Sequence, residues 1–224
     1  QDMIIFLNKT GCKISFLSKR KILIIGSNKF KNTSHDIIFD RIELGTYLIA
    51  AGLAGKKIIL NRIKPEIIKT EIKILKKMGI KMRIEKAKIT VFESKKINKI
   101  NIKTEAYPGF PSDLQAQIMV LMSKGKGTSK VKESIFENRF MHVPELRRMG
   151  AKINIKKNIA TIIGPTNLSG AEVMATDLRA SVSLVLAALV AENKTIINRV
   201  YHLDRGYEKL EKKLKKCKAS INRV

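Results

Sequence analysis

The sequence contains few of the residues on which several classes of protein depend. It has no tryptophan, and aromatic residues make up 5% of its 224 residues, so nucleic-acid bases would find little to stack on. Its two cysteines, Cys12 and Cys217, lie far apart without CxxC or His spacing, which argues against a disulfide framework and a zinc site and suits a reducing cytoplasm. The longest apolar run, Val182 to Ala191, is about half of what a membrane span needs. We therefore expect a cytoplasmic protein with no membrane segment.

Acidic residues are also scarce. There are 19 Asp and Glu against 45 Lys and Arg, which gives a formal net charge of +26 and a pI of about 10.2. Such a balance is typical of proteins that bind polyanions. The lysines are, however, spread along the whole chain rather than gathered in one stripe. We expect no nucleic-acid partner, but a diffuse cationic surface that speeds the arrival of an anionic substrate.

One stretch, residues 105–117, combines backbone restriction with a candidate base. Two prolines and a glycine at positions 108–111 predict an extended, non-helical approach. Ser112 and Asp113 then stand where a helix N-cap belongs, ahead of the apolar run 116–122. Backbone N–H groups and the helix dipole would hold the Asp113 carboxylate in its ionised form, pointing out of the fold. This predicts either a general base or a plain helix cap.

A short segment recurs four times along the chain. Its copies begin at Thr10, Met78, Met149 and Cys217, which are 68 to 71 residues apart. In three copies a glycine follows a helical pattern and precedes an alternating one, as at a helix C′ position that leads into a strand. In the last copy Lys218 takes the place of the glycine, which costs stability if φ is positive there.

The segments between these copies follow one order, β-α-β-α-β-β. The expected helices are 3–8, 41–53, 65–78, 113–123, 138–149, 177–191 and 205–217. The expected strands are 13–16, 21–25, 37–39, 57–61, 80–85, 88–93, 100–103, 129–133, 151–156, 159–163, 172–174 and 195–200. Equivalent units at a fixed period pack around a common core. We place the units at about 39–95, 96–165 and 166–224, after residues 1–38, which hold only the end of a unit and leave apolar strand edges unpaired.

Four blocks in the second half of the chain resemble one enzyme family. They are Glu105–Gln117, Glu133–Leu146, Ala175–Ser181 and Tyr201–Glu208. In this order they resemble the UDP-N-acetylglucosamine enolpyruvyl transferases, the 1-carboxyvinyltransferases of peptidoglycan synthesis. The resemblance covers the whole chain, but only the C-terminal half or so of the family. It implies an inside-out α/β barrel of repeated units, with residues 1–38 as the tail of a first domain, 39–224 as the second domain, and most of the N-terminal domain missing.

The resemblance also implies a reaction. The family transfers the enolpyruvyl group of phosphoenolpyruvate to the 3′-hydroxyl of UDP-N-acetylglucosamine and releases phosphate, the first committed step of cell-wall synthesis and hence of cell shape and division. Such chemistry needs a base for the hydroxyl, an acid for the vinyl carbon and cations for the phosphates. The implied partners are the two substrates and the missing N-terminal domain, and no metal or organic cofactor is implied.

Motif matches give each candidate residue an expected role. Asp113 matches the base and sugar-hydroxyl ligand, beside Ser112, and the backbone of Ile135 matches a contact to the UDP-sugar. Arg205 matches the arginine that binds phosphoenolpyruvate, and we expect it at a helix start, where a cation opposes the dipole. Arg179 is expected either to bind phosphoenolpyruvate or to pair with its neighbour in the Asp-Leu-Arg-Ala-Ser block.

The remaining polar residues of these blocks have structural interpretations. Arg139 is expected to pair with Glu137 or brace its loop, and can also line the cleft. Asp40 and Arg41, at the equivalent place of the preceding unit, are hinge or cleft candidates. Two histidines, His142 and His202, have no nucleophile or carboxylate at triad spacing and are expected to be structural.

The family's Lys-Asn pair and the loop with its catalytic acid belong to the first domain. The two cysteines do not replace the acid, because both lie at expected helix–strand joints. We therefore expect no turnover by this chain alone. The alternatives are a decayed, non-catalytic remnant, a basic polyanion-binding module and, less favoured by the blocks, the sister transferase that acts on shikimate 3-phosphate.

Overall fold

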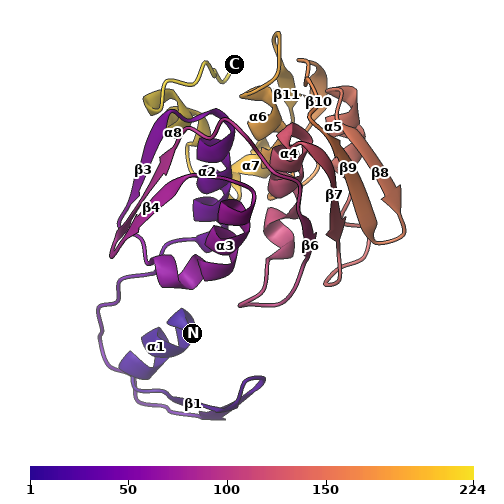
Figure 1. Ribbon diagram of the computed structural model, residues 1–224. Helices are drawn as coiled ribbons and strands as arrows, with labels where there is room; N and C mark the ends of the chain where they lie inside the picture. Colours follow the sequence, from indigo (N-terminus) through magenta and orange to yellow (C-terminus); the bar gives the residue numbers. More distant parts are fainter. The chain divides into compact units, whose positions relative to one another are not determined.

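The computed structural model describes all 224 residues and divides them into two compact units, residues 1–40 and 41–224. The small unit consists of helix α1 (Asp2–Lys9) and an antiparallel hairpin of β1 (Lys13–Ser18) and β2 (Lys21–Ile25) (Figure 1). The Asn8 side chain connects α1 to β1, because its amide both donates to and accepts from the Ile14 backbone at 2.8 Å. Most side chains of the hairpin are exposed.

The strand expected at 37–39 is absent. Residues 28–40 form no helix or strand, and the chain bends at Asn28. Ile37 is 84% exposed and Ile38 39% exposed. A strand needs a hydrogen-bonded neighbour, and no strand pairs with this segment. An apolar pattern alone was therefore a misleading signal at this position.

The large unit alternates helices with strands. Its helical segments are α2 (Arg41–Ala54), the 3-10 turn η1 (Pro65–Ile68), α3 (Lys69–Lys77), the 3-10 turn η2 (Ser112–Leu114), α4 (Gln115–Lys124), α5 (Val143–Arg148), α6 (Val182–Ala188), α7 (Tyr201–Asp204) and α8 (Leu210–Lys216). Its strands are β3 (Lys57–Asn61), β4 (Met82–Glu85), β5 (Lys88–Phe92), β6 (Asn101–Lys103), β7 (Gly127–Lys132), β8 (Lys152–Lys156), β9 (Ile159–Gly164), β10 (Glu172–Met174) and β11 (Ile196–Asn198).

The strands form three sheets that repeat one pattern. The first has the order β3-β5-β4, the second β6-β7-β9-β8, and the third is the parallel pair β10-β11. In the first two sheets, the strand that precedes a hairpin in the chain, β3 or β7, pairs antiparallel with the second strand of that hairpin, β5 or β9. The parallel pairs β6-β7 and β10-β11 each enclose a helix in the intervening chain, as parallel strands require a crossover connection.

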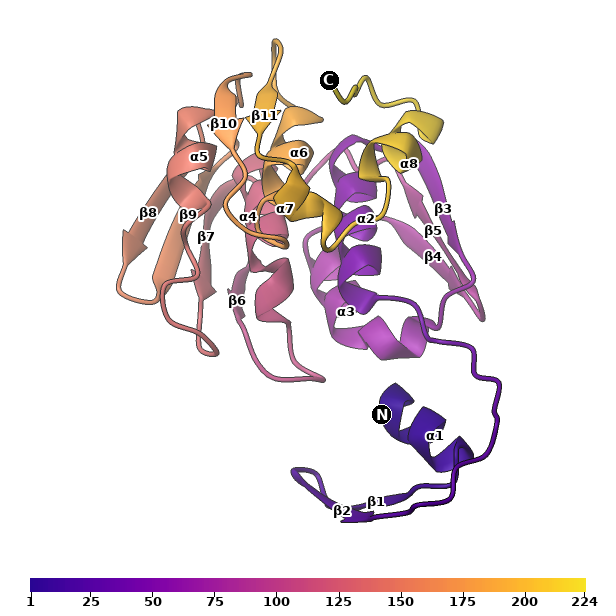
Figure 2. The same cartoon turned by 180° about the vertical axis from the view of Figure 1, so that it is seen from behind.

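The core of this unit consists of helices, with sheets outside them. Helices α2, α4 and α6 contact one another, and Figures 1 and 2 show them in the interior, with β3-β5-β4 on one side and β6-β7-β9-β8 on the other. Every residue of α4 from Gln115 to Ser123 is buried, and its polar side chains, Gln115, Gln117 and Ser123, are hydrogen-bonded within the chain. This arrangement confirms the predicted inside-out α/β fold. No helix in the structure has the length and apolarity needed to cross a membrane.

The predicted glycine joints are confirmed. Gly11, Gly79 and Gly150 have φ of +108°, +91° and +90° after α1, α3 and α5. Lys218, which follows α8 at the fourth copy, has φ of +68°. The backbone thus takes the same left-handed turn in all four copies, and only the last places a Cβ in this unfavourable region.

Three expected helices are shorter than the sequence predicted. The segment 138–149 is helical only as α5, 177–191 only as α6, and 205–217 only as α8, while α7 ends before residue 205. Lys209, with φ of +47°, is the N-cap of α8. Arg205 is consequently the C-cap of α7, not the start of a helix. A cation at that end is favourable to the helix dipole, so the dipole argument for a functional Arg205 was wrong.

Candidate functional site

The approach to Asp113 is a turn, not the extended segment that was predicted. Gly109 donates its backbone N–H to the Ala106 carbonyl at 2.8 Å, and Glu105 donates to the Phe110 carbonyl at 2.8 Å. The prolines restrict φ at both ends, but the glycine between them allows the chain to fold back. Phe110, which is 3% exposed, anchors the end of this turn.

Asp113 lies in η2, at the beginning of the buried helix α4, and its side chain is 43% exposed. Its carboxylate makes no capping hydrogen bond to backbone N–H groups, which corrects the predicted cap. Instead Oδ1 accepts a hydrogen bond of 2.5 Å from Nη2 of Arg139. The partner predicted for Arg139 was Glu137, so this pairing is a second correction. No hydrogen bond within the chain uses Oδ2 of Asp113, and that oxygen is open to a ligand.

Arg139 is held from a second side. Its guanidinium lies over the ring of Phe136 at 5.3 Å from the centroid, a cation–π distance. Phe136 belongs to an exposed loop that also contains Ile135. Ile135 is 41% exposed. The structure thus brings the expected base, Arg139 and the Ile135 loop together.

Glu133, directly after β7, connects this loop to η2. It is 2% exposed. Its carboxylate accepts hydrogen bonds from the Thr104 hydroxyl (2.7 Å), the Ser112 hydroxyl (2.7 Å), the Ile135 N–H (2.8 Å), the Phe136 N–H (3.2 Å) and the Gln115 amide (3.4 Å). The sequence patterns assign no role to Glu133. The signal that could have found it is an acidic residue at the end of an otherwise alternating strand.

These hydrogen bonds determine the ionisation of Glu133. Burial by itself would raise the pKa of its carboxyl group. The Thr104 hydroxyl, the Ile135 N–H and the Ser112 hydroxyl outweigh burial and hold the pKa below its usual range. Glu133 is therefore a buried carboxylate that stays charged because donors surround it.

Arg179 and Arg205 form a second group of candidate residues. Oδ1 of Asp177 accepts from the backbone N–H of Arg179 at 2.7 Å, while the Arg179 guanidinium donates to the Gly206 carbonyl at 3.1 Å. The guanidinium also lies 5.4 Å from the centroid of the Tyr207 ring. Arg205, next to Gly206, is exposed and has no salt bridge within the chain. Arg179 thus holds the segment that presents Arg205.

A buried hydrogen-bond cluster links the two groups. The Tyr207 hydroxyl contacts the Thr46 hydroxyl at 3.0 Å and the Gln117 amide at 3.3 Å. The same amide donates to the backbone carbonyl of Asp113 at 2.9 Å. The segment beside Arg205 and the turn that contains Asp113 are therefore connected through α4.

Arg41 pairs within the first repeat. It donates to Glu71 at 3.0 Å and lies 4.9 Å from the ring centroid of Tyr107, in the turn that precedes Asp113. The Thr70 hydroxyl also donates to the Pro108 carbonyl at 2.6 Å. The first repeat therefore supports the turn that leads to the candidate base.

The other candidates from the sequence have structural surroundings. His142 is 1% exposed, and burial, with the nearby Arg139 charge, lowers its pKa to about 4 although Asp177 opposes the shift. It is neutral at neutral pH, in line with the predicted structural role. Cys12 and Cys217 are free thiols next to α1 and α8. No three His, Cys, Asp or Glu side chains in the chain are grouped as metal ligands.

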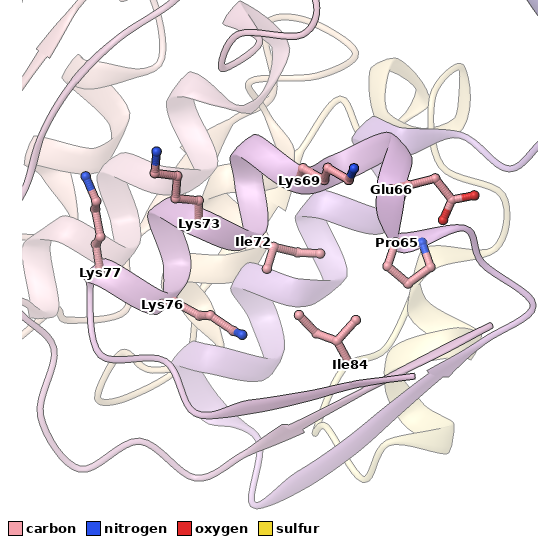
Figure 3. A pocket seen from close by; sticks show the side chains of 8 residues that line it. All are labelled: Pro65, Glu66, Lys69, Ile72, Lys73, Lys76, Lys77 and Ile84. Atoms are coloured by element: carbon pink, nitrogen blue, oxygen red, sulfur yellow. The ribbon is translucent and has the colours of Figure 1, made fainter. Parts of the chain in front are cut away.

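A groove of about 660 Å³ lies elsewhere, between α3 and β4. Figure 3 shows Ile72 and Ile84 facing each other across it, while Lys73 and Lys77 point away. Its four lysines, at positions 69, 73, 76 and 77, are all exposed, which is the normal state of a solvated lysine with an apolar stem. None of the residues expected to carry chemistry lines this groove.

Comparison with known proteins agrees with this architecture. Residues 1–214 match the family EPSP synthase (3-phosphoshikimate 1-carboxyvinyltransferase). Among solved structures, the enolpyruvyl transferase NikO from Streptomyces tendae is similar with a TM-score of 0.88 and 27% identity, over 99% of this chain and 53% of that one. EPSP synthase from Acinetobacter baumannii has the same fold, with a TM-score of 0.74 and 17% identity, over 94% of this chain and 52% of that one.

The chain therefore belongs to the EPSP synthase family of enolpyruvyl transferases. Within that class it is similar to proteins named UDP-N-acetylglucosamine 1-carboxyvinyltransferase: it is 56% identical to the one from Pelagibacter ubique over 100% of this chain and 54% of that protein. It is 47% identical to the one from Caulobacter sp. over 100% of this chain and 52% of that protein. The resemblance inferred from the four blocks is confirmed. The chain spans about half the length of the curated relatives it matches.

Proposed function

We propose that this chain forms the part of a UDP-N-acetylglucosamine enolpyruvyl transferase that binds the acceptor sugar and contains the base. The pair of Asp113 and Arg139 carries this proposal, because Arg139 occupies one carboxylate oxygen and leaves Oδ2 without a partner. A carboxylate with one oxygen open to a ligand can accept the proton of a hydroxyl group. The names of relatives that are 47% to 56% identical support the choice of acceptor.

In the proposed reaction, the 3′-hydroxyl oxygen of the sugar bonds to C2 of phosphoenolpyruvate while its proton passes to Asp113. An acid from outside these residues protonates C3, the vinyl carbon, which gives a tetrahedral intermediate. The bond from C2 to the phosphate oxygen then breaks, and C3 returns a proton to the conjugate base of that acid, so that the double bond forms again and phosphate is released. Ser112 and the Ile135 backbone would contact the nucleotide sugar. Arg179 and Arg205 would bind phosphoenolpyruvate, since guanidinium groups suit phosphate and carboxylate.

In this proposal, the 224 residues are part of a larger enzyme. They span about half of the relatives they match, and the candidate residues include a base and cations but no acid placed opposite the base. We therefore propose that the chain binds the nucleotide sugar, needs the remainder of the enzyme for turnover, and serves the first committed step of peptidoglycan synthesis in the cytoplasm.

Heteronuclear NMR of the labelled chain during titration with UDP-N-acetylglucosamine tests this proposal. We expect shift changes at Asp113, Ile135 and Phe136, and their loss in Asp113→Asn, which keeps the shape of the side chain but removes its charge. The same sample mixed with both substrates is expected to form no product.

Glu85→Gln is the matched control. Glu85 is also a partly exposed carboxylate, at 40% of its side chain, and pairs with Arg83 and Lys88, but it lies on β4, away from the site. It should bind as the unsubstituted chain does. Equal weakening by both substitutions would point to a general loss of negative charge, and shifts spread over the lysine-rich faces would favour non-specific polyanion binding.

A further inference from the structure

We propose that Glu133 is a positioning residue for the acceptor-sugar site, holding the turn of Asp113 and the Ile135 loop in one fixed arrangement; this rests on the proposed function. The carboxylate receives donors from both segments. Ser112, adjacent to the base, donates to Oε2, while the Ile135 and Phe136 N–H groups donate to Oε1. One side chain thus spans two segments that are more than twenty residues apart in the sequence.

The loop is fixed by more than this carboxylate. Thr104 donates its hydroxyl to Oε1 of Glu133, and the same hydroxyl oxygen accepts from the Ser134 N–H at 2.9 Å. The Ser134 hydroxyl donates to the Thr104 carbonyl. Thr104 and Glu133 therefore supply acceptors to three successive backbone N–H groups at positions 134 to 136.

This arrangement determines what the loop offers to a ligand. The Ile135 N–H is used by Glu133, whereas no backbone hydrogen bond within the chain uses the Ile135 carbonyl. A ligand that meets the backbone of Ile135 therefore meets an acceptor, and the matching group must be a donor such as an amide N–H, an imide N–H or a hydroxyl.

The same carboxylate orients the partner of the base. The Phe136 backbone N–H donates to Oε1 of Glu133, and the Phe136 ring lies under Arg139, which in turn holds Asp113. Loss of the Glu133 contacts would release Ser112 and Phe136 together, and so disturb Asp113 from both sides. Because a site must be held within about 0.5 Å of its productive geometry, binding should weaken even in molecules that remain folded.

The test compares binding of UDP-N-acetylglucosamine by the unsubstituted chain and by Glu133→Gln, at a temperature where NMR shows both to be folded. We expect about a tenfold weaker affinity for Glu133→Gln, and upfield movement of the Ile135 and Phe136 amide protons as they lose a charged acceptor. Thr104→Val removes one donor to Glu133 and the acceptor of the Ser134 N–H. It should weaken binding about threefold, and it keeps the test open if Glu133→Gln fails to fold.

Ser129→Ala is the control for a purely structural effect. Ser129 is fully buried in the same strand, and its hydroxyl accepts the Ile100 N–H at 3.1 Å, so its loss destabilises the strand without touching the loop. Its affinity should stay within about twofold of the unsubstituted chain. Equal weakening by Ser129→Ala and Glu133→Gln, or unchanged binding by Glu133→Gln, would overturn the inference while leaving the proposed function intact. An unsubstituted chain that does not bind would overturn both.

Discussion

Two buried glutamates in neighbouring repeats have opposite electrostatic surroundings. Glu71 on α3 and Glu133 after β7 are each 2% exposed. Burial raises the pKa of the Glu71 carboxyl, because its own backbone N–H and Arg41 only partly offset the loss of water. Burial acts on Glu133 in the same direction, but hydroxyl and backbone donors reverse the result and lower its pKa.

The difference shows that equal burial does not imply an equal role. Glu71 has one ion pair, with an arginine side chain that is itself 23% exposed. Glu133 has two hydroxyl and two backbone donors within 3.2 Å. A buried charge with a single partner contributes little to stability, whereas a fully hydrogen-bonded one is costly to disturb. Only the second repeat has such a network, and it is the repeat that contains the candidate base.

The largest expected effect is on stability at neutral pH. Glu133→Gln should lower the free energy of unfolding by about 3 kcal/mol, because its amide group cannot accept from all the donors that the carboxylate holds. Glu71→Gln should lower the free energy of unfolding by about 1 kcal/mol or less, since the substitution replaces a charge that burial destabilises with a neutral group. Urea denaturation of both variants at pH 7 measures the difference. Equal losses would remove the distinction between the two residues.

A smaller effect is expected in the pH dependence of the same variants. The lowered pKa of Glu133 contributes stability above its unfolded pKa of about 4.3, and this contribution is lost as the pH falls through the folded value. The raised pKa of Glu71 has the opposite sign: its contribution is present below about 4.3 and is lost as the pH rises through the folded value. Urea midpoints between pH 7 and pH 3 report both.

Both comparisons use the unsubstituted chain as reference, so the titration of His142 cancels. As the pH falls below about 4.5, the difference in free energy of unfolding between the unsubstituted chain and Glu133→Gln should shrink. The free energy of unfolding of the unsubstituted chain, relative to that of Glu71→Gln, should increase as the pH falls from 7 towards 4.5. Parallel curves for the two variants would contradict the assigned pKa directions.

Much of the fold could be predicted from the sequence because its signals are local. The glycines at 11, 79 and 150 each mark a left-handed turn, and the strand 57–61 is observed with the predicted bounds. Helix boundaries were less predictable. The left-handed Lys209, after which α8 begins, has no sequence signal, since lysine is an ordinary helix former.

The site was less accessible to sequence reasoning because its contacts are long-range. Asp113 was singled out correctly as a partly exposed carboxylate at the beginning of a helix, but its partner Arg139 is 26 residues away. Glu133 looked like one more charged residue in a lysine-rich strand. Its importance depends on Thr104 and Ser112, which only the fold brings to it.

The smallest expected effect concerns the joint that ends the last helix of a repeat. The first and third repeats have the same backbone at this joint but different residues, Gly79 and Lys218. After α8, Ala219 donates to the Leu214 carbonyl at 3.1 Å, as Ile80 does to Leu75 at 3.0 Å after α3. Both helices therefore end in the same cap, with Gly79 at φ of +91° and Lys218 at +68°. Lys218→Gly should raise the free energy of unfolding by about 0.5–1 kcal/mol, because glycine has no Cβ to crowd the following carbonyl.

Lys216→Gly, at the last residue of α8, is the control for this substitution. It should lower the free energy of unfolding by up to about 1 kcal/mol, because Lys216 has a helical backbone, which glycine adopts at a greater entropic cost. Opposite signs for two lysine-to-glycine changes that are two residues apart would show that the backbone of the repeat, and not loss of positive charge, decides the outcome. If both variants gain stability in urea, relief of repulsion in this highly cationic chain would be the better explanation, and the fourth joint would not be strained.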